Sequence, residues 1–191
     1  MIPLVFSIKD MKEHELYLIM SSASEIRNRN IELIRKVSGE GYYVLVITTN
    51  QLHDMLTRNY EKNGIQMDKI YFVDAVTKYA LGHDPLPVKN CRFVNNPANL
   101  TDIGIAVTET LKELQGKKVC MLLDSVNSML IYISSKNITR FIHFVTNRLR
   151  LLNFTGIFLA VEKGLDPDVL TQLTTFVDEV IDSDTDHLDH P

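Results

Sequence analysis

The feature that most constrains the fold is an alternation along the chain between short apolar segments and longer segments with helical spacing of apolar residues. The apolar segments lack the alternation of polar and apolar residues that marks a sheet with one face in water, so they are predicted to be strands buried on both faces. The predicted strands are 16–20, 42–47, 69–74, 118–124, 156–161 and 177–181. The predicted helices are 25–38, 52–60, 100–115, 137–152 and a short helix that begins at 167.

Buried strands that alternate with amphipathic helices predict the α/β fold class, as a three-layer αβα sandwich with a mainly parallel sheet. A chain of 191 residues with 45% hydrophobic content is expected to form a single domain over residues 1–182. Residues 183–191 read as an acidic, disordered tail. Residues 75–90 are expected to be irregular and 92–94 to form a short edge strand.

Three positions carry the signature of a helix N-terminus. Ser24 is predicted to cap the first helix, and either Asn99 or Thr101 the helix over 100–115. Asp166-Pro167 places an N-cap residue before a proline at the first helical position. In a parallel sheet of this kind, ligands bind beyond the carboxyl ends of the strands, so function is expected there.

Composition excludes several classes of partner. A net charge of −4 gives no general basis for binding nucleic acid or an anionic membrane, and no apolar segment approaches the ~20 residues of a membrane span. Pro3 and Lys9-Asp10 interrupt the N-terminus before a signal peptide can form, so a cytoplasmic location is expected. Cys91 and Cys120 are therefore predicted to be free, buried thiols.

Two strand ends carry the functional information. The strand 118–123 runs into Asp124-Ser125, which is the form of a Walker B element. The strand 16–20 runs into a helix, and in a working nucleoside triphosphatase this connection would read G-x-x-x-x-G-K-[ST]. Here residues 21–30 contain neither the glycines nor the lysine, so the sequence favours the architecture and disfavours the activity.

These segments give the chain a resemblance to the RecA-type ATPases, and specifically to the KaiC-like branch that is widespread in archaea. The resembling segments are 41–49, 64–74 and, most closely, 122–130, within a similarity that extends over about residues 16–182. The resemblance implies a RecA-like sheet of the P-loop NTPase superfamily in an archaeal, cytoplasmic protein. It also implies edge-to-edge assembly, either as a homo-oligomer or with an active KaiC-like paralogue.

The departures from that family predict a pseudo-ATPase with a degenerate Walker A. The side chains of residues 21–24 resist the backbone dihedrals of a phosphate loop, and Glu25 would place negative charge where phosphate belongs. The family's catalytic carboxylate after the second strand is replaced by residues 48–51, which are Thr, Thr, Asn and Gln. We therefore expect no catalytic residue and no cofactor, and a regulatory or protein-interaction role without nucleic acid or membrane.

The alternative is a residual nucleotide-binding protein or slow ATPase that binds Mg-ATP through a non-standard phosphate loop. Arg27 or Arg29 would then replace the lysine, although both are a helical turn away and more readily explained as solvent-facing. Asp124 would organise magnesium, unless it only caps the turn that follows. The degenerate nucleotide site would comprise Ser21, Ser22, Ser24, Arg27, Asp124 and Ser125, although turn and capping chemistry explains the three serines equally well. The direction of Glu25 separates the two hypotheses, and a DNA-associated recombinase relative is the weakest third.

Two further clusters have ordinary explanations beside functional ones. Residues 182–190 imitate the start of a calcium loop, but lack its glycine and distal glutamate, so a disordered acidic tail is favoured. Lys136, Arg140, His143 and Arg150 lie near one stripe of their helix. This stripe is interpreted as a solvated face, with docking of an acidic partner or of nucleic acid as the alternative.

Overall fold

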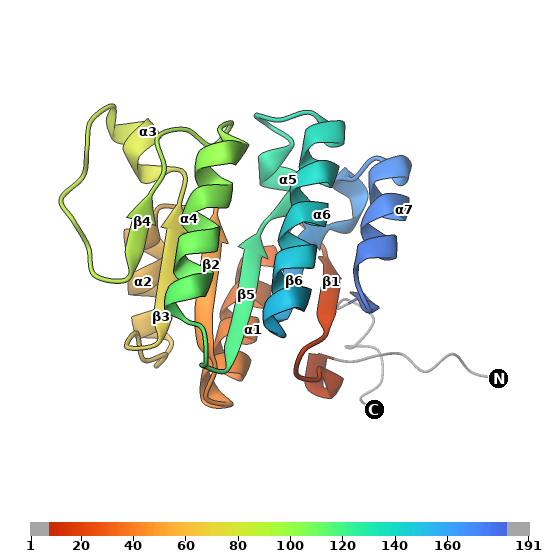
Figure 1. The fold of residues 1–191 in the computed structure, drawn as a ribbon, viewed down its shortest axis with the longest axis horizontal. Coiled ribbons are helices and arrows are strands. Elements are labelled where there is room, and N and C mark those ends of the chain that lie inside the picture. The colour runs from red at the N-terminus through yellow and green to blue at the C-terminus, as the bar shows by residue number, and fades with distance from the viewer. Residues whose placement is uncertain (1–7, 183–191) are drawn as a thin grey trace.

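The computed structural model describes residues 8–182, which form a seven-stranded parallel sheet in the order β4-β3-β2-β5-β6-β1-β7 (Figure 1). The strands are β1 Leu16–Ser21, β2 Tyr43–Thr48, β3 Ile70–Asp74, β4 Cys91–Phe93, β5 Val119–Asp124, β6 Thr155–Val161 and β7 Glu179–Asp182. The α-helices are α1 Ile26–Gly39, α2 His53–Lys62, α3 Thr77–Leu81, α4 Leu100–Glu113, α5 Val126–Met129, α6 Ser135–Leu152 and α7 Pro167–Phe176. Two short 3-10 helices, Ile8–Asp10 and Glu162–Gly164, complete the described elements. The predicted α/β class with a parallel sheet is confirmed.

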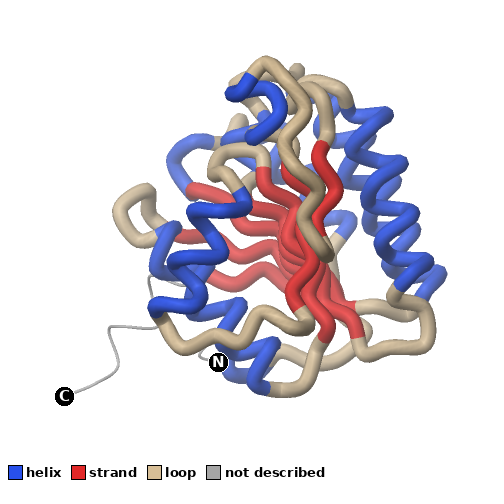
Figure 2. Tube along the Cα trace, turned by 90° about the vertical axis from the view of Figure 1, so that its left-hand side faces the viewer, coloured by secondary structure: helices blue, strands red, loops and turns tan. Residues whose placement is uncertain are grey.

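The sheet lies between two layers of helices (Figure 2). Successive side chains of a strand point to opposite faces, and β1 is buried along its whole length. Leu16 and Leu18 belong to the core shared with α4, α6 and α7, whereas Tyr17 and Ile19 belong to the core shared with α1 and α2. This burial on both faces explains the continuous apolar strands and confirms the three-layer αβα arrangement.

Two of the three predicted helix caps are confirmed. The Asn99 side chain accepts a hydrogen bond from the Asp102 amide at 3.1 Å, and the Asp166 side chain accepts one from the Asp168 amide at 2.8 Å, with Pro167 in the first turn. The prediction for Ser24 is wrong. Ser24 lies in the turn that precedes the helix, one residue before the N-cap position. Glu25 occupies that position, and its side chain forms no capping hydrogen bond.

The interval 75–90 is not wholly irregular, because α3 lies inside it. The helix starts on the Asp74 carboxylate, which accepts hydrogen bonds from the Val76 and Thr77 amides, both at 2.8 Å. Gly82 ends it with φ of 73°, a conformation that favours glycine. The predicted edge strand is confirmed as β4 at one end of the sheet.

Both cysteines are free thiols, as predicted, Cys120 fully buried and Cys91 partly buried. Burial raises the pKa of both thiols. No helix within residues 8–182 has the length and apolar character that a membrane crossing requires. The predicted acidic tail at 183–191 lies outside the described residues.

Candidate functional site

A cavity of about 220 Å³ opens at the carboxyl ends of the central strands. The end of β5 supplies a carboxylate and a hydroxyl, α5 supplies an amide and a second hydroxyl, and the first turn of α1 supplies an arginine. The lining residues are Ile26, Arg27, Asn50, Gln51, Asp124, Ser125, Asn127, Ser128, Ile131 and Val161. The site therefore lies where a doubly covered parallel sheet is expected to bind a ligand.

Asp124 is the acid of this cavity and is only 5% exposed. Its Oδ2 accepts a hydrogen bond from Asn30 Nδ2 at 2.7 Å, and Asn30 Oδ1 accepts one from the hydroxyl of Tyr60 at 2.7 Å. Burial raises the pKa of Asp124 to about 6, against the lowering effects of the Asn30 hydrogen bond and the positive charge of Arg27. Near neutral pH this carboxylate therefore gains or loses a proton easily.

The turn after β5 is capped by serines. Ser125 Oγ accepts from the Ser128 amide at 3.3 Å, and Ser128 Oγ accepts from the Ser125 amide at 3.1 Å, which forms a reciprocal capping box for α5. The hydroxyl of Ser128 also lies 2.7 Å from that of Thr49, beyond the end of β2. The interpretation of Asp124 as the cap of this turn is therefore wrong, since its carboxylate joins the network of Asn30 and Tyr60.

The connection from β1 to α1 is a closed turn of four residues, Ser22 to Glu25. The amides of Glu25 and Ile26 both donate to the Ser22 carbonyl, at 3.2 and 3.1 Å. The Ser22 and Ser24 hydroxyls lie 3.2 Å apart, and Ser21 is buried at the end of β1. Two amides at the start of the helix are thus used within the turn itself.

Three of the six predicted site residues come together in the cavity, namely Arg27, Asp124 and Ser125. Ser21, Ser22 and Ser24 are not among the residues that line it. Glu25 is exposed and accepts a hydrogen bond from Asn28 at 3.2 Å, so it is directed along its own helix. Arg29, the other arginine considered, is buried and bonded to Glu32, so the expectation that it faces solvent is wrong, whereas Arg27 is exposed as expected.

The sequence did not predict the roles of Asn30 and Tyr60. The signal for Asn30 was its place on the apolar stripe of α1, between Ile26 and Leu33-Ile34, where a polar residue needs a buried partner. Its partner Asp124 is 94 positions away in the chain. Only the fold brings the two side chains together.

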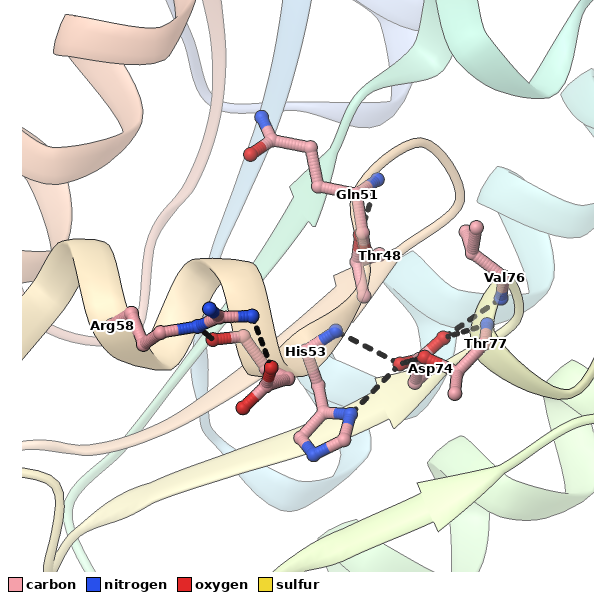
Figure 3. Close-up of polar contacts among 8 residues, drawn as sticks. Thr48, Gln51, His53, Arg58, Asp74, Val76 and Thr77 are labelled. Carbon is pink, nitrogen blue, oxygen red and sulfur yellow. Dashed lines mark hydrogen bonds and ion pairs between the residues drawn. The ribbon is translucent and has the colours of Figure 1, made fainter. Parts of the chain in front are cut away.

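A second polar cluster surrounds Asp74 at the end of β3 (Figure 3). The fully buried carboxylate accepts hydrogen bonds from the His53 amide at 2.9 Å and from the Val76 and Thr77 amides, with further contacts from the His53 ring at 3.1 Å and the Thr77 hydroxyl. Burial acts to raise the pKa of Asp74, but the hydrogen bonds from His53 and Thr77 outweigh it and hold the pKa below its ordinary value. Asp74 thus ties the starts of α2 and α3 to the sheet.

Within the described residues, donor atoms of His53, Asp74 and Cys91 all lie within 4.8 Å of one another, a spacing that could hold a metal ion. Two observations argue for a structural role instead. Both carboxylate oxygens of Asp74 already accept hydrogen bonds, and burial raises the pKa of the Cys91 thiol, whereas a metal binds the thiolate. The cavity at Asp124 is therefore the stronger candidate site.

The parallel sheet between two helical layers is the fold of several solved structures, among them that of a KaiC-like protein. Solved structures with this fold include the KaiC-like protein PH0186 from the archaeon Pyrococcus horikoshii, with 14% identity, a TM-score of 0.65, and coverage of 89% of this chain and 72% of that one. The uncharacterized protein PH0321 from the same organism, in complex with an unknown peptide, has 16% identity, a TM-score of 0.66, and coverage of 91% and 78%. The flagellar accessory protein FlaH from Methanocaldococcus jannaschii has 15% identity, a TM-score of 0.55, and coverage of 89% and 71%.

Residues 18–183 match the model of one protein family, described as a family of unknown function, DUF7504. The chain belongs to this family. No curated protein matches the sequence.

Proposed function

We propose that this chain is a KaiC-like domain with a degenerate Walker A, that it does not hydrolyse ATP, and that it acts as a regulatory or protein-interaction module in the cytoplasm of an archaeon. The observation that carries the proposal is the closed turn from Ser22 to Glu25, whose amides at Glu25 and Ile26 donate to the Ser22 carbonyl. A phosphate loop binds its ligand through backbone amides that are free and converge on the phosphates. The two amides that donate to Ser22 do not meet that condition.

The size and chemistry of the cavity support the same proposal. Its volume of about 220 Å³ is below the roughly 300–1,000 Å³ of typical small-molecule sites. Its lining contains no lysine and, besides Asp124, no carboxylate. Phosphoryl transfer depends on positioning and on charge stabilisation. A site that lacks both the phosphate cradle and a second carboxylate is therefore a poor catalyst of ATP hydrolysis.

Protein partners fit this role. The solved structure of PH0321, which shares the fold, is in complex with an unknown peptide. RecA-type domains assemble edge to edge, so a homo-oligomer or a complex with an active KaiC-like paralogue is the expected assembly of this chain.

The test is isothermal titration calorimetry and a thermal-shift assay with Mg-ATP and Mg-ADP, at concentrations that detect a Kd of about 1 mM, which corresponds to about 4 kcal/mol of binding free energy. We expect no heat of binding and no stabilisation. Binding that is lost in the Asp124→Ala variant would overturn the proposal and would establish a variant nucleotide site.

One observation favours residual nucleotide binding as the second candidate function. Arg27 lines the cavity with Asp124 and exerts a charge effect on it, while Glu25 is turned toward Asn28. An arginine in the cavity can bind a phosphate, and Glu25 lies outside the lining, so Asp124 is the one described carboxylate near such a ligand. Under this hypothesis Arg27→Ala abolishes a heat of binding that Arg58→Ala retains, since Arg58 is exposed on α2 and pairs with Asp54.

A further inference from the structure

A groove of about 680 Å³ runs between α4 and α6 on the outer face of one helical layer. Figure 1 shows both helices in front of the sheet, with β5 visible between them. The lining of the groove includes Gly104, Ile105, Lys112, Arg140, Phe144 and Arg148. It is separate from the Asp124 cavity, with which it shares no lining residue.

Large apolar side chains in this groove remain accessible. Ile105 is 52% exposed and Phe144 is 42% exposed, and they belong to the two helices that form the opposite walls. Gly104 lies in the interior of α4, where a Cβ atom would lie 3.5 Å from Phe144 and 3.8 Å from Phe141, both ordinary contacts. Packing therefore does not require this glycine, although glycine is unfavourable in a helix interior. Its effect is to deepen the groove.

The groove has the length of a helical segment. It follows α4 from Leu100 to Lys112, a distance of about 18 Å or a little over three helical turns. A second hollow adjoins it, since it shares Leu100, Thr101 and Asn137 and continues to Asn96 and Ile133. An elongated apolar trough of this length matches the docking of an amphipathic helix through anchors at i, i+3 or i+4, and i+7.

The charge of the groove is positive. Lys112, Arg140 and Arg148 line it, and none of the three forms an ion pair within residues 8–182. Glu109 is the one carboxylate in the lining, and it pairs with Arg92 at 3.1 Å.

Arg148 adds a second observation. Its Nε is buried without a hydrogen-bond partner, and its guanidinium carbon lies 5.9 Å from the centroid of the Phe144 ring. Because this Nε is covered in the free chain, an incoming acceptor would engage it only if the Arg148 side chain moves. Although the chain has a net charge of −4, the groove is a local positive surface that attracts negatively charged groups.

We infer that the groove between α4 and α6 binds one amphipathic α-helix of a partner protein, with apolar anchors between Ile105 and Phe144 and with Asp or Glu residues opposite Arg140 and Arg148. The inference rests on the proposed function as a protein-interaction module and identifies the surface that performs it. The predicted basic stripe of α6 contributes only Arg140 to this groove, because Arg150 pairs with Asp178 and His143 packs on Phe176. An apolar trough between two helices favours a helix over nucleic acid, whose binding needs a continuous cationic surface.

The experiment is a selection from a display library of stabilised α-helices of about five turns, randomised at one face and counter-selected against the Phe144→Asp variant. We expect the selected helices to carry apolar residues at helical spacing and an excess of Asp and Glu. Their affinity should fall at least tenfold for Ile105→Asp and for Arg140→Glu. Replacement of their acids by lysine should restore binding to Arg140→Glu. Leu151→Asp is the matched control, because Leu151 is 78% exposed on α6 and lies outside the groove.

Circular dichroism and thermal unfolding establish that each variant is folded. Failure to select any helix, selected helices with basic or unpatterned faces, or equal binding to the Ile105→Asp variant would overturn the inference. Competition of a mixed-sequence oligonucleotide with the selected helices for the groove would also overturn it. So would sedimentation that shows a wild-type dimer which Ile105→Asp dissociates, because a second copy of the chain would then occupy the groove. Nucleotide binding is measured separately on the wild-type chain and tests the proposed function. Failure of the proposed function can therefore be distinguished from failure of the inference about the groove.

Discussion

Asp74 and Asp124 occupy equivalent places at the ends of β3 and β5, the two strands that flank β2, yet their pKa values shift in opposite directions. Asp74 accepts bonds from three backbone amides, the His53 ring and the Thr77 hydroxyl, and its pKa is lowered. Asp124 accepts one from Asn30, and burial raises its pKa to about 6. The number of donors around a buried carboxylate decides whether its charged form is stabilised. A carboxylate whose acceptor positions are all occupied by protein donors has a structural role. A carboxylate that faces a cavity with unoccupied acceptor positions can still contact a ligand.

The shift of Asp124 predicts a pH dependence of stability. Its pKa is about 6 in the folded chain and about 3.9 when unfolded, so the folded state binds the extra proton between these values and the free energy of unfolding falls as pH rises from about 4 to 6. The expected loss is on the order of 2–3 kcal/mol. Urea unfolding at intervals across this range measures it.

Asp124→Asn should remove this loss, because asparagine does not titrate and its carbonyl can accept from Asn30. The lowered pKa of Asp74 acts in another window, since its contribution is lost as pH falls below the ordinary range of an aspartate. Equal pH profiles for wild type and Asp124→Asn would show that Asp124 titrates with an unshifted pKa.

At the scale of single residues, the sequence predicted the carboxylate and the hydroxyl at the end of β5 but not the residues around them. Asp124 and Ser125 follow directly from a buried strand that ends in polar residues. Asn30 and Tyr60, the next members of the network, come from α1 and α2, and no local rule pairs them with β5. The serines at 21, 22 and 24 do not line the cavity, and the turn closes on the Ser22 carbonyl, which agrees with the alternative that they serve turn chemistry.

At the scale of elements, the side chains of Leu149 from α6 and Leu16 from β1 pack over Gly156 of β6, which has no side chain. A Cβ atom there would lie 2.6 Å from Leu149 Cδ1 and 2.9 Å from Leu16 Cδ2. Both leucines are fully buried, so neither can move without repacking the core. Gly156→Ala should therefore lower the free energy of unfolding by about 1–3 kcal/mol.

Chemical denaturation of Gly156→Ala measures this cost, and Gly39→Ala is the control. A Cβ atom at Gly39 meets nothing within 4 Å, so this substitution near the end of α1 should be close to neutral. A loss of stability in the control as large as that in Gly156→Ala would contradict the steric explanation.

The elements themselves were largely predictable, because each strand is continuously apolar and each long helix has its own apolar stripe. The helices α3 and α5 were not predicted, because they are short and depend on hydrogen bonds rather than on periodicity. Asp74 initiates α3, and the reciprocal bonds of Ser125 and Ser128 initiate α5. The cap of α1 was assigned to Ser24, one residue before the cap position at Glu25.

At the scale of the whole molecule, the strand order places β2 and β5 in the interior of the sheet and the short β4 and β7 at its edges. The sequence predicts parallel strands, but the same elements are compatible with other orders. Interior strands are paired on both sides, so their amides exchange only through large openings of the structure. We expect hydrogen exchange, followed by mass spectrometry, to be slowest in β2 and β5 and fastest in β4 and β7. Exchange in β7 as slow as in β5 would indicate that its free edge is covered in solution, as edge-to-edge assembly would do.

The burial of the two cysteines has a practical consequence for the molecule as a probe. Thiols with raised pKa values carry little thiolate at neutral pH, and alkylating reagents react with the thiolate. A maleimide dye should therefore modify a cysteine introduced at Ile105 far faster than Cys91 or Cys120. One fluorophore could then report on the groove between α4 and α6 without removal of either native cysteine.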